Sequence, residues 1–136
     1  MAMKGRETSI KSFRDLTFDR SAFDNAMELF RVSRGFPAEE RFSLTSQIRR
    51  SSRSVAANIV EAWRKRRYEA AFVSKLSDAE TEAAETQVWI EFAVKCGYVD
   101  RTVAGPIYRE YERLVGALVG MIAHADRWII RHSSSK

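Results

Sequence analysis

Apolar residues recur at the spacing of an α-helix in four stretches of the chain, separated by polar residues. The first stretch covers residues 19–34. No Gly or Pro lies between Pro37 and Gly97, and this span is too long for one ordinary globular helix, so we expect two helices divided at the polar residues 64–68. The fourth begins near residue 100 or 106 and continues to about residue 129. Short connections between long amphipathic helices predict an all-α fold, an antiparallel up-down four-helix bundle.

Each expected helix carries an apolar stripe that should face the core of the bundle. The members are Phe23, Ala26, Met27 and Phe30 in the first; Leu44, Ile48, Ser52, Val55, Ile59, Ala62 and Trp63 in the second; Phe72, Leu76, Ala79, Ala83, Ile90 and Val94 in the third; and Ile107, Tyr111, Leu114, Leu118, Met121, Ile122, Ala125, Trp128 and Ile129 in the fourth. We expect residues 1–136 to form one domain, ordered from about residue 13 to residue 131 and frayed at both ends.

Length and composition fit one small soluble domain. The chain has 136 residues, 45% of them hydrophobic and 30% charged, as in an ordinary globular protein. The longest uncharged stretch, residues 114–125, has 12 residues, fewer than the roughly 18 that a membrane-spanning helix needs. Because the first residues contain no apolar segment typical of a secretory signal, we expect a cytoplasmic protein without membrane contact. The single cysteine, Cys96, excludes an intramolecular disulfide and a cysteine-built zinc site.

No catalytic constellation is visible in the sequence. A di-iron site in a bundle needs Glu-x-x-His pairs, but Met121 and Ile129 stand three residues before His124 and His132. The chain has neither a glycine-rich phosphate loop nor a Gly-x-Ser-x-Gly nucleophile motif. We therefore expect a protein that is not an enzyme and that has no metal, cofactor or small-molecule substrate.

The net charge of +5 is distributed unevenly. Residues 39–67 carry eight positive and three negative side chains, whereas residues 69–95 carry two positive and six negative ones. In the acidic segment Asp78, Glu82 and Glu85 share one helical stripe without apolar neighbours, which favours a solvated face or an interface over acid–base chemistry. This asymmetry indicates either a polyanionic partner for the basic segment or self-association between unlike faces.

Arginines gather on one side of the expected second helix. At about 100° per residue, four of them lie close together in angle and away from the apolar stripe; this arginine ridge consists of Arg49, Arg50, Arg53 and Arg64. The basic run continues with Lys65, Arg66 and Arg67. The ridge fits a solvated face, phosphate binding by the arginines, or pairing with the acidic helix of a neighbouring subunit.

A polar line follows the other flank of the same helix. Gln47, Ser51, Ser54 and Asn58 recur at spacings of four, three and four residues. Such a line favours hydrogen bonds between helices, and a bound ligand is the alternative. Beyond it, Trp63 and Tyr68 adjoin the basic run and would stack on unpaired bases if exposed, although Trp63 also belongs to the apolar stripe.

A family resemblance rests on these same residues. The chain between residues 36 and 62 resembles the signature F-P-x-x-E-x-x-x-L-x-x-Q-x-R-R-A-x-x-S-x-x-x-N-I-A-E-G of the bacterial 23S rRNA-intervening-sequence proteins. The residues that carry the resemblance are Phe36-Pro37-Ala38-Glu39-Glu40, Leu44, Gln47, Arg49-Arg50, Ser54 and Asn58-Ile59-Val60-Glu61. Gly97 and Tyr98 after the third helix also fit that family. The chain departs from the signature at Ser51, Val60 and Ala62, where the family has Ala, Ala and Gly.

The resemblance implies a homopentameric ring of four-helix bundles with a basic surface and no established biochemical activity. It also implies a gene of the kind that lies within an insert of a large-subunit ribosomal RNA gene or stands free. Related ring-forming accessory proteins of diversity-generating retroelements bind nucleic acid and partner a reverse transcriptase.

Two hypotheses about function follow from the basic helix and the resemblance. One is a non-catalytic oligomer that binds RNA or DNA through the basic second helix. The other is a scaffolding oligomer with a protein partner, in which the arginine ridge contacts Asp78, Glu82 and Glu85 of a neighbouring subunit.

Uncharged residues surround a large part of the expected fourth helix. Apolar side chains between Leu114 and Ile122 cover more than half of its circumference, and Gly116 and Gly120 lie on the remainder. A second uncharged face needs something to pack against. We therefore expect a homo-oligomer, with residues 116–123 at a subunit contact or in the tightest crossing within the bundle, and we expect Gly120→Leu to disrupt assembly or folding.

Overall fold

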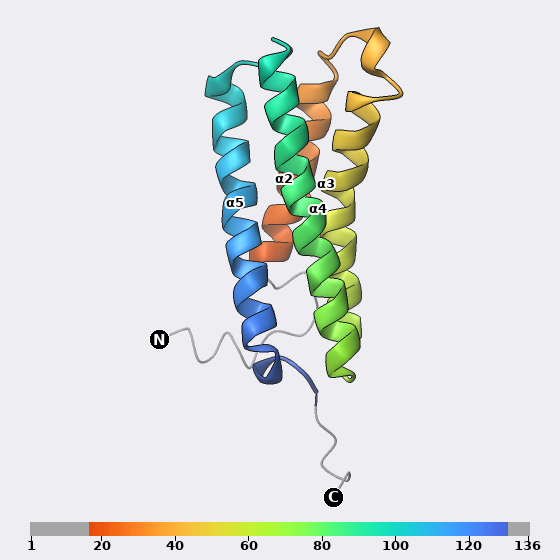
Figure 1. Ribbon diagram of the computed structural model, residues 1–136, viewed down its shortest axis with the longest axis vertical. Helices are drawn as coiled ribbons and strands as arrows, with labels where there is room; N and C mark the ends of the chain where they lie inside the picture. The colour runs from red at the N-terminus through yellow and green to blue at the C-terminus, as the bar shows by residue number, and fades with distance from the viewer. Residues whose placement is uncertain (1–16, 131–136) are drawn as a thin grey trace, which may run out of the picture.

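Four long helices pack side by side along one axis (Figure 1). The structure is a computed structural model that describes residues 17–130. Its elements are α2 (Thr17–Ser33), the 3-10 turn η2 (Ala38–Glu40), α3 (Leu44–Arg64), α4 (Glu69–Lys95), α5 (Arg101–Ala123) and the 3-10 turn η3 (Ala125–Arg127). No strand occurs among these residues. The predicted all-α four-helix bundle is confirmed, and the predicted frayed ends lie outside the described residues.

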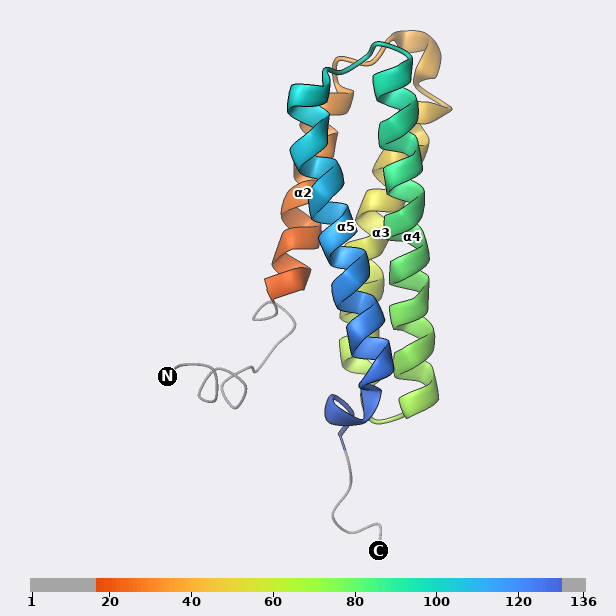
Figure 2. The same cartoon turned by 60° about the vertical axis from the view of Figure 1, so that its left-hand side comes forward.

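Consecutive helices are joined at alternate ends of the bundle. The chain rises through α2, descends α3, rises through α4 and descends α5 in the view of Figure 1. α2 has 17 residues, fewer than α3, α4 and α5 with 21, 27 and 23. Figure 2 shows that the lower end of α2 lies well above that of the other three helices. Among the described residues, the lower part of the bundle therefore consists of α3, α4 and α5.

The helix ends follow local backbone chemistry. The predicted break between the second and third helices is confirmed, because α3 ends at Arg64 and α4 begins at Glu69. α4 is stopped by Gly97, whose φ of +79° is a conformation that glycine adopts without strain. The backbone N–H of Gly97 donates to the carbonyl of Val94, and that of Tyr98 donates to the carbonyl of Ala93. These two bonds form a Schellman motif, which satisfies carbonyls at the helix end.

The core is built from the predicted stripes of α3, α4 and α5. Val55, Phe72, Tyr111 and Leu118 are fully buried and come from all three helices. The α5 stripe is shorter than predicted, however. Because α5 ends at Ala123, the predicted stripe members Ala125, Trp128 and Ile129 lie in η3 and after it, not on the fourth helix.

The buried face of α2 differs from the predicted one. The predicted Ala26 is buried, but Phe23 and Met27 are 45% and 40% exposed, and the buried apolar positions beside Ala26 are Ala22 and Leu29. The two small alanines allow a close approach of α2 to the bundle. Phe23 and Met27 instead line a shallow groove between α2 and α3. The predicted stripe was therefore rotated from the true one by roughly one residue.

A pair of buried hydroxyl groups joins α3 to α4. Ser51 and Thr86 are both fully buried, and their oxygen atoms are 2.7 Å apart. Thr86 also donates to the carbonyl of Glu82. Ser51 is one of the departures from the family signature, and the structure provides its hydroxyl with this partner on the neighbouring helix.

Candidate nucleic-acid interface

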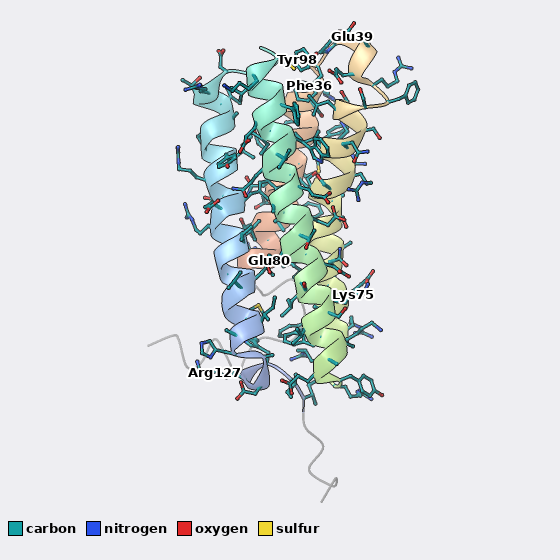
Figure 3. The ribbon with its side chains drawn as sticks, in the orientation of Figure 1. Phe36, Glu39, Lys75, Glu80, Tyr98 and Arg127 are labelled. Atoms are coloured by element: carbon teal, nitrogen blue, oxygen red, sulfur yellow. The ribbon has the colours of Figure 1, made fainter. Side chains whose placement is uncertain are left out.

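Signature residues meet at the upper end of the bundle, which we call the signature end and define by Phe36, Glu40 and Tyr98. Figure 3 shows Phe36 and Tyr98 close together there. Their ring centroids are 5.6 Å apart. The Tyr98 hydroxyl donates to Glu40 Oε2 at 2.9 Å. These contacts tie the α4–α5 connection to the α2–α3 connection, so this part of the family signature has a structural role.

Glu40 also receives hydrogen bonds from the start of α3. The Ser43 hydroxyl donates to Glu40 Oε1 at 2.6 Å, and the backbone N–H of Leu44 donates to the same oxygen at 3.1 Å. Bonds from Ser43, Tyr98 and Leu44, in that order of size, lower the pKa of the Glu40 carboxyl. The bond to Glu40 is also the main reason that the pKa of Tyr98 is raised to about 12. The carboxylate thus caps the N-terminus of α3.

Three arginines surround the ring of Phe30 on the α2–α3 face. The guanidinium carbons of Arg34, Arg49 and Arg53 lie 5.0, 4.7 and 5.7 Å from the centroid of that ring. Arg49 also donates through Nε to the Ser33 hydroxyl at 2.7 Å. Within residues 17–130, none of the three forms an ion pair. We call Arg34, Arg49 and Arg53 the arginine cluster; cation–π contacts hold it while its charge stays uncompensated.

Arg50 behaves differently from its neighbours on the ridge. Its guanidinium is 3.2 Å from Glu82 Oε1 and 3.3 Å from Glu85 Oε1, both on α4 of the same chain. The hydrogen bond to Glu82 is the largest cause of a raised Arg50 pKa. Arg50, Glu82 and Glu85 were predicted as binding or subunit-contact residues, and the structure shows that they pair within one chain. Asp78, the third acidic candidate, lies 3.9 Å from Lys75.

The remaining predicted cations lie at the opposite end, in the connection between α3 and α4. We call this lower end, formed by residues 64–68 and η3, the basic end. Arg64, Lys65 and Arg67 are exposed, and none of them forms an ion pair within the part of the chain described here. Arg66 is half-buried, with its guanidinium 3.6 Å from the centroid of the Trp63 ring, and burial lowers its pKa. Tyr68 is 65% exposed.

Trp63 belongs to the core, as its position in the apolar stripe predicts. It is 8% exposed and contacts Trp128 edge to face, with ring centroids 6.3 Å apart. Stacking of a base directly on Trp63 is therefore not supported. Tyr68, by contrast, keeps the exposure that such stacking needs.

The predicted polar line of α3 does not form one site. Only Ser51 reaches another helix through a hydrogen bond, to Thr86. Asn58 donates to the carbonyl and hydroxyl of Ser54 within α3, and Gln47 is exposed. Glu61, the last member of the signature, pairs with Lys75 of α4 at 2.8 Å. These contacts favour helix packing over a bound ligand for this flank.

Gly116 and Gly120 do not form a tight crossing within the bundle. A Cβ added at either position would meet nothing within 4 Å, because both residues face open space. That part of the expectation is wrong for residues 17–130, and Figure 2 shows the reason: α2 begins at Thr17 above the lower half of α5. A contact between subunits at these glycines stays a prediction.

Arg34 is the member of the arginine cluster that the sequence analysis missed. It follows the last turn of α2, four residues after Phe30, and at this spacing two side chains on a helix are neighbours. The periodicity of the second helix could not reveal it, since Arg34 comes from another element.

Within residues 17–130 no group of three His, Cys, Asp or Glu side chains could hold a metal ion. None of the described helices is long and apolar enough to cross a membrane.

The fold and the site define a small α-helical bundle protein with an arginine-rich face. The chain belongs to the 23S rRNA-intervening sequence protein family, whose model matches residues 14–120. It is similar to a crystal structure of a protein of unknown function from the S23 ribosomal protein family of Bacteroides thetaiotaomicron VPI-5482. The two are 27% identical with a TM-score of 0.70, and the match covers 78% of this chain and 95% of that one. No curated protein matches the chain.

Proposed function

We propose that this protein is a non-catalytic, cytoplasmic homo-oligomer that binds RNA through α3 and the basic end. One observation carries the proposal: Arg49, Arg53, Arg64, Lys65 and Arg67 form no ion pair within residues 17–130. Uncompensated guanidinium groups are the preferred partners of phosphate oxygens. The family description, which refers to a ribosomal RNA insert, supports RNA as the polyanion.

The spacing of these cations along α3 suits a phosphate backbone. Arg49 and Arg53 are four residues apart, a rise of about 6 Å, and Arg64 follows after about 16 Å more on nearly the same side of the helix. The arginine cluster and the basic end would then contact two separated parts of one strand. Phosphate contacts of this kind bind many sequences, and their strength falls steeply with salt.

The test is a titration of the full chain with a single-stranded RNA, an RNA hairpin and the matching DNA at 50 and 200 mM salt. We expect binding of RNA that weakens strongly at the higher salt. The variant Arg49→Glu with Arg53→Glu should lose most of the affinity while it keeps its mass in light scattering. Arg109→Glu with Arg113→Glu, an equal change of charge on α5, is the matched control and should weaken binding much less.

Absence of RNA binding by the wild-type chain at 50 mM salt would overturn the proposal. If the Arg49 and Arg53 variant instead loses its oligomeric mass, the arginine cluster is a subunit contact, and the scaffolding hypothesis with a protein partner such as a reverse transcriptase takes its place.

Assembly has support of its own in the exposed apolar residues of α4 and α5. Val88 and Phe92 of α4 are 43% and 53% exposed and line one hollow against α5, and Val119 of α5 is 46% exposed. An exposed apolar surface of this kind is typical of a protein–protein contact. We expect light scattering to give a pentamer, five times the chain mass of 15.6 kDa, and a stable mass near 15.6 kDa would contradict assembly.

A further inference from the structure

A hollow at the basic end combines aromatic rings with cations. Its volume is about 550 Å³, within the range of small-ligand sites. It lies between the end of α3, the end of α5 and η3. We call it the tryptophan hollow, and its main lining residues are Trp63, Arg66, Gly120, His124, Arg127 and Trp128. Among residues 17–130, α2 stops above this region, and none of these residues covers the side of α5 around Gly120 (Figure 2).

The walls of the tryptophan hollow are held in place by several contacts. Arg66 donates through Nε to the carbonyl of Trp63 at 2.9 Å, while its guanidinium lies against the Trp63 ring. The backbone N–H of Ile130 donates to the carbonyl of Arg66 at 2.8 Å, which ties the chain after η3 to the α3–α4 connection. Trp128 packs edge to face on Trp63. The site is therefore formed before any ligand arrives, which reduces the entropy cost of binding.

The chemistry of the lining selects for a planar anion. Arg66 and the half-buried Trp128 provide flat surfaces on which an aromatic ring can stack. Arg127 and His124 are exposed at the same hollow, Figure 3 places Arg127 at this lower end, and no carboxylate is among the lining residues. Gly120 contributes only backbone to the wall, and no atom of the described residues lies within 4 Å of a Cβ added there. A ligand that has both an aromatic ring and a phosphate uses all of these features.

We propose that the tryptophan hollow binds a nucleotide, with the base against Trp128 and Arg66 and the phosphate toward Arg127 and His124. The inference rests on the proposed RNA-binding function and deepens it, since Arg64, Lys65 and Arg67 adjoin the lining residues Trp63 and Arg66 in the chain and would guide a strand to the hollow. The nucleotide is either free or an unpaired residue of RNA, and the two sources share the same chemistry.

The experiment measures binding to the full chain by calorimetry at low salt, with AMP, adenosine, inorganic phosphate and a single-stranded hexa-adenylate as probes. We expect AMP or the hexa-adenylate to bind and adenosine and phosphate to bind at least about tenfold more weakly. Binding of the hexa-adenylate without AMP assigns the site to a strand, and binding of AMP assigns it to free nucleotides as well. No binding of either AMP or the hexa-adenylate would overturn the proposal.

Two leucine substitutions on α5 locate the site. Gly120→Leu places a side chain in the hollow and should weaken binding at least about tenfold. Gly116→Leu is the matched control, because Gly116 is equally open and lies one turn away but does not line the hollow. Equal affinity of Gly120→Leu and the wild type, or equal losses in both variants, would overturn the proposal. If Gly120→Leu does not fold, Arg127→Gln, at an exposed position, serves as the second test. It should weaken the binding of AMP or of the hexa-adenylate and leave the affinity for adenosine unchanged. Unaltered binding of both AMP and the hexa-adenylate would overturn the proposal.

The outcomes separate this inference from the proposed function. If RNA binding is lost in the Arg49→Glu with Arg53→Glu variant but is unaffected by Gly120→Leu, the proposed RNA-binding function is supported and the proposed nucleotide site in the hollow is overturned. If AMP binding depends on Gly120 but the chain binds no RNA, the nucleotide site in the hollow is supported and the proposed RNA-binding function is overturned.

Discussion

At the signature end of the bundle an aromatic pair and a carboxylate are joined to each other, whereas at the basic end an aromatic pair lies among cations. Tyr98 donates to Glu40, and Glu40 caps α3, so the polar groups of the signature end have partners inside the chain. At the basic end, Arg64 and Arg67 form no ion pair within residues 17–130. The comparison separates residues that stabilise the fold from residues available to a partner.

This difference teaches that membership in a family signature does not by itself mark a binding residue. Phe36 and Glu40 belong to the signature and connect two loops. The cations of the basic end lie outside the signature, although they carry the charge that a polyanion would meet. We therefore expect substitutions at the signature end to change stability and substitutions at the basic end to change binding.

The largest effect is expected from Phe36→Ala. Phe36 is 8% exposed and packs on Tyr98. Its truncation should lower the free energy of unfolding by about 3 kcal/mol, the usual cost of removing a buried aromatic ring. Phe42→Ala is the control, since Phe42 lies in the same connection but is 87% exposed, and it should change the free energy by less than about 0.5 kcal/mol. Chemical denaturation measures both, and equal losses would contradict the assignment of the signature end.

Charge reversal at the basic end should affect binding and leave stability nearly unchanged. The variant Arg64→Glu with Arg67→Glu removes two exposed cations that have no partner in the described chain. We expect RNA affinity to fall by about tenfold or more, and the slope of log affinity against log salt to shrink by about 1 for each lost phosphate contact. Titrations at several salt concentrations measure the slope. A large drop in melting temperature with unchanged affinity would reverse the comparison between the two ends.

The next prediction concerns the acid limb of the stability curve. The pKa of Glu40 is lower in the folded chain than its ordinary value of 4.5. Its stabilising contribution is therefore present above about pH 4.5 and is lost as the pH falls below that value. Glu40→Gln should melt at a lower temperature than the wild type at pH 7, and the gap should narrow toward pH 3. Melting curves of Glu39→Gln, an exposed neighbour, should follow the wild type at every pH; a constant gap for Glu40→Gln would argue against the linkage.

The smallest effect is expected from Arg50→Gln. The guanidinium pairs with Glu82 and Glu85, but its side chain is 51% exposed, and ion pairs of this kind contribute at most about 1 kcal/mol. Because Arg50 is occupied within the chain, its loss should weaken RNA binding less than Arg53→Gln does. Parallel titrations of the two variants test this ranking. A greater loss for Arg50→Gln would show that the pairs with α4 open when RNA binds.

The sequence was sufficient for the helices and for most of the core. Gly97 and residues 64–68 marked the helix ends, and the period of the apolar residues in α3 gave the buried face. The site required three-dimensional information. Angles around one helix place Arg50 and Arg53 on the same ridge, and they do not show that Arg50 meets glutamates of α4 whereas Arg53 meets Phe30 of α2.

The cations and Trp63 of the basic end could be predicted from the sequence, but the tryptophan hollow could not, for a related reason. Trp63 and Trp128 are far apart along the chain, and their contact depends on α5 ending at Ala123 so that the following residues turn back. The prediction of the buried face of α2 was partly wrong because small and large apolar residues alternate on neighbouring faces of that helix. Periodicity correctly predicted that Ala26 faces the core, but it did not decide that Ala22 and Leu29, not Phe23 and Met27, join it there.

The buried hydroxyl pair between α3 and α4 has a consequence for how the two helices find their alignment. A seam of alanines and aliphatic side chains tolerates sliding, because apolar contacts are non-directional. A slide of one helical turn, about 5.4 Å, would separate Ser51 from Thr86 and forfeit a hydrogen bond worth about 1 kcal/mol. Together with the exposed Arg50–Glu82 and Glu61–Lys75 ion pairs, the hydroxyl pair favours one vertical register of α3 on α4, and alanine at position 51 would remove the buried part of that preference.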